Sequence, residues 1–324
     1  MARSYNSFAR LGEGIYRFSR GTSGASGPRV TLLGGVHGNE RIGVRVLDAL
    51  RLALLTNAAR VADGASVTLV YANTQALRVG TRGATPHADL NRCFTAEILS
   101  ASNDKSSLYE ETRARELAPL LAETDVLVDL HSTNKPSAPF VRLAGAAALT
   151  PESVRIAARL PCEILLHDPQ YLIADGRVAL TDEFVGAHGG VGVCFESGLA
   201  TDLSPHKVDS IVSGLWAILT HDTRAVEATP PLVAANAPTG FAHAYEITQV
   251  FKLTSAGFRW ADGVGDANFQ RIAPRQTIGF VGDEAFAVDY EAFILFPKVP
   301  ALWKLGAPLG WLTKKKPTPP PHRG

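Results

Sequence analysis

The first 220 residues alternate between short apolar runs and longer segments in which apolar side chains recur at helical spacing. The short runs, at residues 30–35, 67–71, 126–130 and 191–195, predict strands. The longer segments, at residues 41–55, 108–122, 151–160 and 205–220, predict helices. Strands separated by helices favour parallel pairing, because each helix returns the chain across the sheet. We therefore expect an α/β fold with a mainly parallel sheet and helices on both faces.

The pattern changes after about residue 226. Residues 227–238 are rich in proline and alanine and predict a linker. Beyond them, strand-like runs at 242–252, 276–281 and 287–297 are separated by glycine and aspartate, with no clear helix. We therefore divide the chain into a large α/β domain at 1–226, a C-terminal all-β domain at 227–299 and a tail at 300–324. The tail ends in lysines and prolines, which predict partial disorder.

The composition excludes several classes of protein. With 46% hydrophobic and 19% charged residues, the 324-residue chain has enough apolar material for a large core. The net charge of +1 creates no field that would attract nucleic acid or an anionic membrane. No apolar run is long enough to span a bilayer, and the N-terminus lacks the apolar core of a signal peptide. Cys93, Cys162 and Cys194 show no disulfide or metal-ligand spacing, so we expect reduced thiols in a cytoplasmic protein.

A glycine-rich turn at residues 34–40, with the sequence GGVHGNE, joins the first of these strands to the first helix. In parallel α/β sheets ligands bind beyond the C-terminal strand ends, which is where this turn lies. His37 and Glu40 are close enough for a tight turn to aim both at one point, and imidazole nitrogen and carboxylate oxygen suit zinc. The alternatives are an ordinary turn or a dinucleotide site, although the motif lacks G-x-G-x-x-G spacing and Glu40 would repel a pyrophosphate.

A second polar group ends the predicted strand at 126–130, in the sequence VLVDLHST. Asp129 and His131 are two residues apart and therefore lie on the same face of the strand. His131 then lies at the same edge of the sheet as His37. Together with Glu40 it completes a set of two histidines and one carboxylate, which is a ligand set of catalytic zinc sites. Asp129 could orient a ligand, or it could bond to nearby backbone.

Two arginines and a glutamate add further candidate chemistry. Arg92, in the sequence ADLNRCF, offers a planar fork for a carboxylate beside the neutral donor Asn91, and Arg82 lies in a glycine-flanked loop. One arginine could polarise a carbonyl while the other holds a substrate carboxylate, or both could be surface charges. Glu196 follows the predicted strand at 191–195. It could transfer a proton from zinc-bound water to a leaving amine, or it could be an ordinary turn carboxylate.

The order of these motifs resembles one family. His-Gly-Asn-Glu at 37–40, Asp-Leu-Asn-Arg at 89–92, Asp-Leu-His at 129–131 and a glutamate at a strand end are similar to aspartoacylases and succinylglutamate desuccinylases. The likeness covers most of the first 220 residues or so. It implies a zinc-carboxypeptidase-like fold, with a mostly parallel mixed sheet flanked by helices and a small C-terminal β domain.

The resemblance also implies roles for individual residues. His37, Glu40 and His131 would bind one zinc ion, and Glu196 would act as general base and then general acid. Arg82 would polarise the carbonyl and stabilise the oxyanion. The substrate α-carboxylate would be gripped by Asn91 and Arg92. The expected activity is hydrolysis that removes the acyl group from a small N-acyl amino acid.

Two departures from the family bear on the substrate. Aspartoacylases carry a tyrosine in a Glu-Ala-Ala-Tyr-Tyr stretch of the β domain, where this chain has the run EAFI at residues 291–294. They also carry an arginine shortly before the catalytic glutamate, whereas residues 178–192 here contain no lysine or arginine. We therefore do not expect N-acetylaspartate itself to be the substrate.

Three other functions remain as alternatives. A zinc carboxypeptidase acting on short peptides would share every core residue and differ in pocket depth. A non-catalytic metal- or metabolite-binding protein would bind zinc without hydrolysis, but it would need neither Glu196 nor Arg82. A purely structural protein would leave the polar clusters unexplained. The sequence permits an oligomer, and we expect a small-molecule substrate with no nucleic-acid or membrane partner.

Overall fold

The computed structural model describes residues 8–20, 27–62, 64–102, 108–220 and 240–319 of the chain. Within these ranges the strands are β1 Phe8–Gly12, β2 Ile15–Ser19, β3 Arg29–Gly34, β4 Ser66–Tyr71, β5 Val126–Thr133, β6 Phe140–Ala144, β7 Ile164–Asp168, β8 Val191–Leu199, β9 His243–Lys252, β10 Phe258–Trp260, β11 Gln270–Ile272, β12 Thr277–Val281, β13 Glu284–Ala287, β14 Ala292–Leu295 and β15 Pro308–Lys316. The helices are α1 Arg41–Thr56, α2 Thr74–Val79, α3 Ala96–Ser100, α4 Tyr109–Ala122, α5 Pro151–Ala157, α6 Thr181–Ala187 and α7 Pro205–Leu219, with 3₁₀ turns η1 Ala58–Arg60, η2 Leu90–Arg92, η3 Leu172–Ala174 and η4 Pro300–Leu302.

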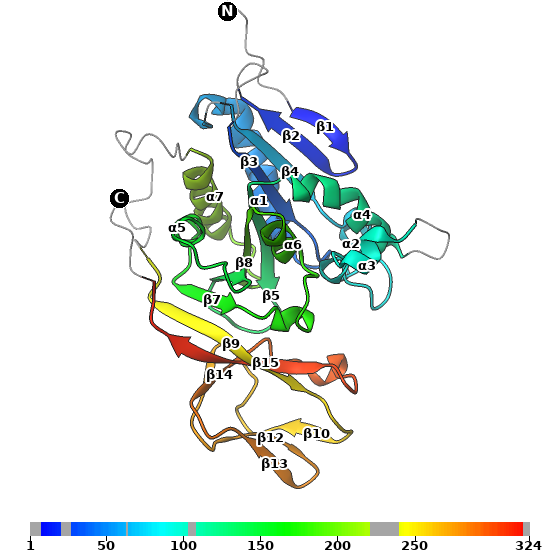
Figure 1. Cartoon of the computed structure of the whole chain (residues 1–324), viewed down its shortest axis with the longest axis vertical. Helices are drawn as coiled ribbons and strands as arrows, with labels where there is room; N and C mark the ends of the chain where they lie inside the picture. The colour runs from blue at the N-terminus through cyan, green and yellow to red at the C-terminus, as the bar shows by residue number, and fades with distance from the viewer. Residues whose placement is uncertain (1–7, 21–26, 63, 103–107, 221–239, 320–324) are drawn as a thin grey trace, which may run out of the picture.

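Most described strands form one mixed sheet of 12 strands, in the order β1-β2-β4-β3-β5-β8-β6-β7-β9-β15-β14-β11. At its centre β4, β3, β5 and β8 are parallel neighbours. Antiparallel pairs flank this group, since β2 runs against β4 and β6 runs against β8. Figure 1 shows the sheet passing through the middle of the molecule. The predicted α/β fold with a mostly parallel, mixed sheet is therefore confirmed.

Helices cover both faces of the central strands (Figure 1). On one face, α1, α5 and α7 bury apolar side chains such as Leu50 and Leu215 against the sheet. On the other face, α4 and α6 bury Leu117 and Phe184 against residues that include Leu127 of β5. The helical spacing of apolar residues thus predicts α1, α4, α5 and α7. It misses the short helix α6, which lies in a stretch rich in glycine. No helix in the described ranges has the length and apolar character needed to cross a membrane.

The C-terminal strands extend this sheet. β9 pairs in parallel with β7, and β15 lies between β9 and β14. A separate three-stranded sheet, in the order β10-β12-β13, lies at the lower end of the molecule in Figure 1. The described residues beyond 240 contain no α-helix, as the sequence predicts. Continuous pairing across β7 and β9 brings the C-terminal strands next to the α/β part.

The predicted tail at residues 300–324 is wrong over the stretch that forms β15. Trp311 and Leu312 of this strand are buried, and the strand pairs on both sides. The error has a physical cause, because the lysines and prolines near the C-terminus mask the short apolar run PLGWL at residues 308–312. The predicted linker at 227–238 lies outside the described residues, and the domain boundaries stay a prediction.

Candidate metal centre and active-site pocket

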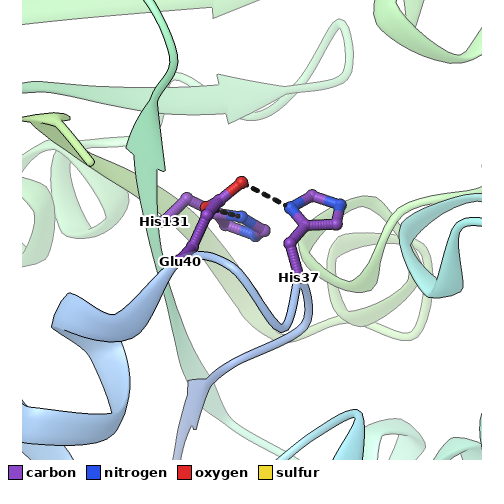
Figure 2. A group of neighbouring side chains, drawn as sticks. All are labelled: His37, Glu40 and His131. Carbon is purple, nitrogen blue, oxygen red and sulfur yellow. Dashed lines mark hydrogen bonds and ion pairs between the residues drawn. The ribbon is translucent and has the colours of Figure 1, made fainter. Parts of the chain in front are cut away.

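The glycine-rich turn after β3 sets His37 and Glu40 side by side. Gly35 has a φ of +72°, which glycine adopts without steric cost. Gly38 packs so closely that a Cβ would lie 2.1 Å from the Ala76 carbonyl. The amide of Glu40 donates to the carbonyl of His37 at 3.1 Å, and α1 begins at the next residue. The turn therefore holds both side chains towards one point, as Figure 2 shows.

His131 approaches the same point from β5, the neighbouring strand (Figure 2). His37 Nδ1 lies 2.8 Å from one carboxylate oxygen of Glu40, and His131 Nδ1 lies 3.2 Å from the other. One candidate ligand atom from each of the three residues lies within 4.8 Å of the other two, and all three side chains are buried. Residues that are up to 94 positions apart, 131 − 37, thus converge at one edge of the sheet.

The far nitrogen of each histidine is held by a carboxylate. His37 Nε2 lies 2.9 Å from Asp89 Oδ1, and His131 Nε2 lies 2.9 Å from Asp129 Oδ2. Such partners fix the orientation of a ring whose other nitrogen binds a metal. The sequence leaves open whether Asp129 orients a ligand or bonds to nearby backbone. Its contact with His131 favours the orienting role. Asp89 is a partner that the sequence analysis does not assign, although it begins the Asp-Leu-Asn-Arg motif.

The electrostatics of this cluster favour a bound cation. Burial opposes ionisation of Glu40, yet His37 and His131 hold its pKa below the usual value. Burial also opposes protonation of His131, but Asp129 and Glu40 raise its pKa well above the usual value. The same negative charges that attract a proton attract a divalent metal ion. Two imidazoles and a carboxylate, each positioned by further hydrogen bonds, therefore fit zinc.

Glu196 lies beside His131, because β5 and β8 pair in parallel with these two residues in register. Its side chain is buried and lines the same pocket as the histidines. Its Oε2 has no hydrogen-bond partner among the described residues. Burial raises the pKa of Glu196 to about 7, although the positive charge of His131 opposes the shift. A carboxyl group with a pKa near neutrality can accept a proton and release it again.

Arg82 reaches the cluster from the loop after α2. Its Nε and one terminal nitrogen donate to Asp89 Oδ2 at 3.2 and 2.9 Å. The other terminal nitrogen lies 3.7 Å from Glu40 Oε1 and makes no hydrogen bond with a described residue. The guanidinium is therefore anchored on one side by Asp89 and presents a donor beside the candidate metal ligands.

Asn91 and Arg92 belong to the 3₁₀ turn η2. The Asn91 side-chain oxygen accepts the backbone N–H of Thr181 at 3.0 Å, and its amide nitrogen lies 3.5 Å from His131 Nε2 with a second hydrogen left for another partner. Thr181 also donates its hydroxyl to Asp129 at 2.5 Å, which links η2, α6 and β5. Arg92 donates to the carbonyl of Asn91 at 2.6 Å and makes no ion pair with any described residue. Both side chains line the pocket.

One pocket of about 650 Å³, its open mouth included, contains this chemistry. That size is ordinary for a site that binds a small molecule. Its lining includes every predicted site residue, namely His37, Glu40, Arg82, Asn91, Arg92, His131 and Glu196. Apolar walls come from Phe140, Ile173, Leu180, Phe296 and Trp311. Trp311 belongs to β15, and Phe296 directly follows β14. Both the α/β part and the C-terminal strands therefore form the pocket.

Two cationic residues of the pocket are not among the predictions. Arg142 of β6 is fully buried and bonded to Asp168, Asp182 and Glu183. Lys298 follows β14 and lines the pocket from the C-terminal side. In the sequence, the run FVRLA around Arg142 and the tetrapeptide FPKV around Lys298 carry no motif. The only available signal was a charged residue within an apolar run, which is unusual for a buried strand.

Fold and site together define an α/β protein with a mostly parallel, mixed sheet and a candidate metal centre at the C-terminal ends of parallel strands. The model of the succinylglutamate desuccinylase/aspartoacylase catalytic domain matches residues 26–221. The chain therefore belongs to the succinylglutamate desuccinylase/aspartoacylase family, as the motifs predict.

Two curated relatives match a shorter segment. The human N-acyl-aromatic-L-amino acid amidohydrolase (carboxylate-forming) is 39% identical over 111 residues, which are 32% of this chain and 33% of the relative. The zebrafish (Danio rerio) aspartoacylase is 35% identical over 112 residues, which are 32% of this chain and 34% of the relative. The match thus spans about a third of the length of each relative.

Solved structures match over nearly the whole chain. The succinylglutamate desuccinylase from Chromobacterium violaceum superposes with a TM-score of 0.69 at 22% identity, covering 96% of this chain and 91% of that one. Murine aminoacylase 3 superposes with a TM-score of 0.64 at 20% identity, covering 91% of this chain and 97% of that one. At these identities the likeness shows the shared fold, C-terminal strands included.

Proposed function

We propose that this protein is a zinc-dependent amidohydrolase that removes the acyl group from a small N-acyl amino acid. The observation that carries the proposal is the convergence of His37, Glu40 and His131 beside Glu196 in one pocket. Family membership supports hydrolysis, since the relatives that match include an N-acyl-aromatic-L-amino acid amidohydrolase and an aspartoacylase. The size of the pocket supports a small substrate.

The two histidines and Glu40 would hold the zinc ion. When bound there, zinc supplies a Lewis acid that polarises a carbonyl and lowers the pKa of water. Asp89 and Asp129 orient the histidines from behind. The chain itself supplies the remaining chemistry.

Glu196 transfers the proton in the proposed reaction. It removes a proton from the water molecule that attacks the amide carbon, and it delivers that proton to the nitrogen of the departing amino acid. Arg82 donates to the carbonyl oxygen as negative charge develops on it, and donors of this kind typically lower the barrier by about 3–4 kcal/mol. Because Asp89 anchors the guanidinium, Arg82 needs little reorganisation to do so.

The substrate would be held at both of its ends. Arg92 and the amide nitrogen of Asn91 bind the α-carboxylate, for which a guanidinium fork is well suited. The apolar walls, which include Phe140 and Trp311, contact the apolar part of the substrate. These walls favour an apolar or aromatic amino acid over N-acetylaspartate.

The cysteines support a reducing compartment. Cys93, Cys162 and Cys194 are all unpaired and buried. Proteins of oxidising compartments usually pair their cysteines, so we place the protein in the cytoplasm. Its partner in this proposal is the small-molecule substrate.

The proposal is tested by a hydrolysis screen of the full chain loaded with zinc. The substrates are N-acetyl-L-phenylalanine, N-acetyl-L-aspartate, N-succinyl-L-glutamate and the dipeptide glycyl-L-phenylalanine, and the readout is release of free amine. We expect turnover of an N-acyl amino acid, with N-acetyl-L-phenylalanine favoured over N-acetyl-L-aspartate. The variant Glu196→Gln serves as the control and should lose about 10²–10⁴-fold in turnover while zinc stays bound.

The alternatives give different results in the same screen. Activity on the dipeptide alone would favour the alternative of a zinc peptidase acting on short peptides over deacylation. Zinc binding without turnover of any substrate would indicate a metal-binding protein. Full activity of Glu196→Gln would remove Glu196 from the mechanism.

A further inference from the structure

The pocket is lined by three arginines and one lysine whose partners differ. Arg82 is paired with Asp89, and Arg142 is surrounded by three buried carboxylates. The other two, Arg92 and Lys298, make no ion pair with any residue that the structure describes. Burial lowers the pKa of both, and Asp89 lies near enough for its negative charge to oppose this shift, but no described carboxylate is within ion-pair distance of either. A site that keeps two partly buried cations without a directly bound counter-ion is suited to bind an anion.

The position of Lys298 is fixed by its backbone. Its carbonyl accepts the indole N–H groups of Trp260 at 3.1 Å and Trp303 at 2.9 Å, and its amide donates to the carbonyl of Leu309 at 2.8 Å. The ammonium group lies 5.8 Å from the ring centre of Trp311, which is near the outer limit of a cation–π contact. The backbone is thus held by three hydrogen bonds, while the ammonium keeps its hydrogen-bonding capacity.

The charge of Lys298 acts in the same part of the pocket as that of Arg92. Burial lowers the pKa of Lys298 to about 8, and the positive charges of Arg82 and Arg92 lower it further, while the negative charges of Asp89 and Glu196 oppose the shift. Burial likewise lowers the pKa of Arg92. An anion bound between Arg92 and Lys298 would therefore relieve the burial cost of both groups and the repulsion between them.

We propose that Lys298 binds the substrate carboxylate together with Arg92, and is therefore a specificity-determining residue for substrates with a free carboxylate. The inference rests on the proposed function. Arg92 supplies a planar fork from the α/β part of the chain, and Lys298 supplies a compact charge from the C-terminal strands. The substrate carboxylate would thus bridge the two parts of the protein. An uncharged carboxamide in its place would leave both cations without a counter-ion.

The inference is tested by crossing variants with two probes. The probes are N-acetyl-L-phenylalanine and its uncharged analogue N-acetyl-L-phenylalaninamide, and the variants are Lys298→Met and Lys298→Arg. In Lys298→Met we expect kcat/KM for the acid to fall about 10–100-fold, mainly through KM, as for the loss of a hydrogen bond between charged groups. For the amide the fall should be much smaller. Lys298→Arg, which keeps the charge, should recover most of the preference for the acid.

A matched control removes a lysine elsewhere in the C-terminal strands. Lys252 of β9 pairs with Asp175 at the surface and does not line the pocket. Lys252→Met should leave the ratio of acid to amide unchanged. An equal loss on both probes in Lys298→Met would overturn the inference, because a merely structural lysine would act in that way. Undiminished kcat/KM of Lys298→Met for both probes would also overturn it.

A second readout does not depend on turnover. In the zinc-loaded Glu196→Gln variant, limiting acetic anhydride acetylates accessible amines, and peptide mass spectrometry gives the extent at Lys298. We expect N-acetyl-L-phenylalanine to protect Lys298 at least about threefold, and the amide to protect it little. Equal protection of Lys298 by both probes, or no protection by either probe, contradicts the inference. Protection by the acid without hydrolysis in wild type would support the carboxylate site and reject the proposed reaction, so the two failures are distinguishable.

Discussion

Asp89 and Asp129 each contact a histidine that is a candidate metal ligand. In both cases the carboxylate contacts the ring nitrogen that points away from the cluster. A carboxylate in this position makes the imidazole a better ligand and prevents the ring from rotating. Asp129 is itself fixed, because it accepts the hydroxyl of Thr181. The candidate metal centre is therefore built by more residues than the three that would contact the ion.

Substituting Asp129 tests this orienting contact. We expect Asp129→Asn to lower zinc affinity about 10–100-fold with little change in fold, since an amide holds the His131 ring less strongly. Chelator competition measures the affinity. The matched control is Asp125→Asn, which disrupts only a surface contact with Arg29. Equal affinities of Asp129→Asn and wild type would show that the contact is dispensable.

The sequence predicted which candidate residues lie together where their neighbours along the chain position them. His37 and Glu40 share one turn, and Asp129 and His131 share one strand face, so local periodicity alone places each pair. Lys298 could not be found in this way. Its significance depends on a pocket wall that forms only when β14 packs beside the α/β part.

At the scale of elements, the turn between β3 and α1 controls the site. Gly38 lies against the backbone of α2, where even a methyl group would meet the Ala76 carbonyl at 2.1 Å. Any larger residue must displace the turn that carries His37 and Glu40. The geometry of the candidate metal centre therefore depends on a residue that contributes no ligand.

The variant Gly38→Ala tests this dependence. We expect it to lower zinc affinity by about tenfold or more, the size of effect seen when ligand orientation is disturbed. Gly186→Ala is the matched control, since no heavy atom lies within 4 Å of the added Cβ. Isothermal titration with zinc compares the two. Wild-type affinity in Gly38→Ala would mean that the turn adjusts without moving its ligands.

Strand β6 shows why some elements could not be predicted. Arg142 interrupts its apolar run, yet the side chain is buried because β7 and α6 supply Asp168, Asp182 and Glu183 around it. Local pattern cannot anticipate such partners. The structure confirms the predicted strands at the centre of the sheet, of which only the run at 126–130 contains a charged residue, Asp129.

Removing the charge of Arg142 should destabilise the whole protein. Arg142→Met leaves three buried carboxylates without their common counter-ion, and breaking a buried pair in this way typically costs about 3–5 kcal/mol. Urea unfolding measures the change. Arg271→Met is the control, because Arg271 and its partner Glu291 are both exposed and such pairs contribute about 1 kcal/mol or less. A loss no larger than that of the control would contradict the interpretation of this network.

At the scale of the whole molecule, the C-terminal strands complete both the sheet and the pocket. Trp311 of β15 donates its indole N–H to the carbonyl of Leu172 at 2.8 Å, and Asn268 donates its backbone N–H to the carbonyl of Pro136 at 2.9 Å. The sequence predicted an all-β region here, but not that β9 would pair with β7. Long-range pairing between strands so far apart leaves no local signal.

Truncation tests this integration. A chain ending at residue 239 would lack β9 and would therefore expose the edge of β7. It would also expose Leu166, which in the full chain shares an apolar cluster with Trp311. We expect it to aggregate, because unpaired strand edges promote association. Size-exclusion chromatography with circular dichroism measures the outcome. A folded, monodisperse fragment that binds zinc as tightly as the full chain would show that the C-terminal strands are an independent addition.

The central claim is that His37, Glu40 and His131 form one zinc site. The most direct test is the zinc content of the full chain after chelation, reloading and removal of free metal, compared between wild type and His131→Ala. We predict about one zinc ion per wild-type chain and less than about a tenth of that in a folded His131→Ala variant. Wild-type protein without stoichiometric zinc, or undiminished zinc in His131→Ala, would contradict the account.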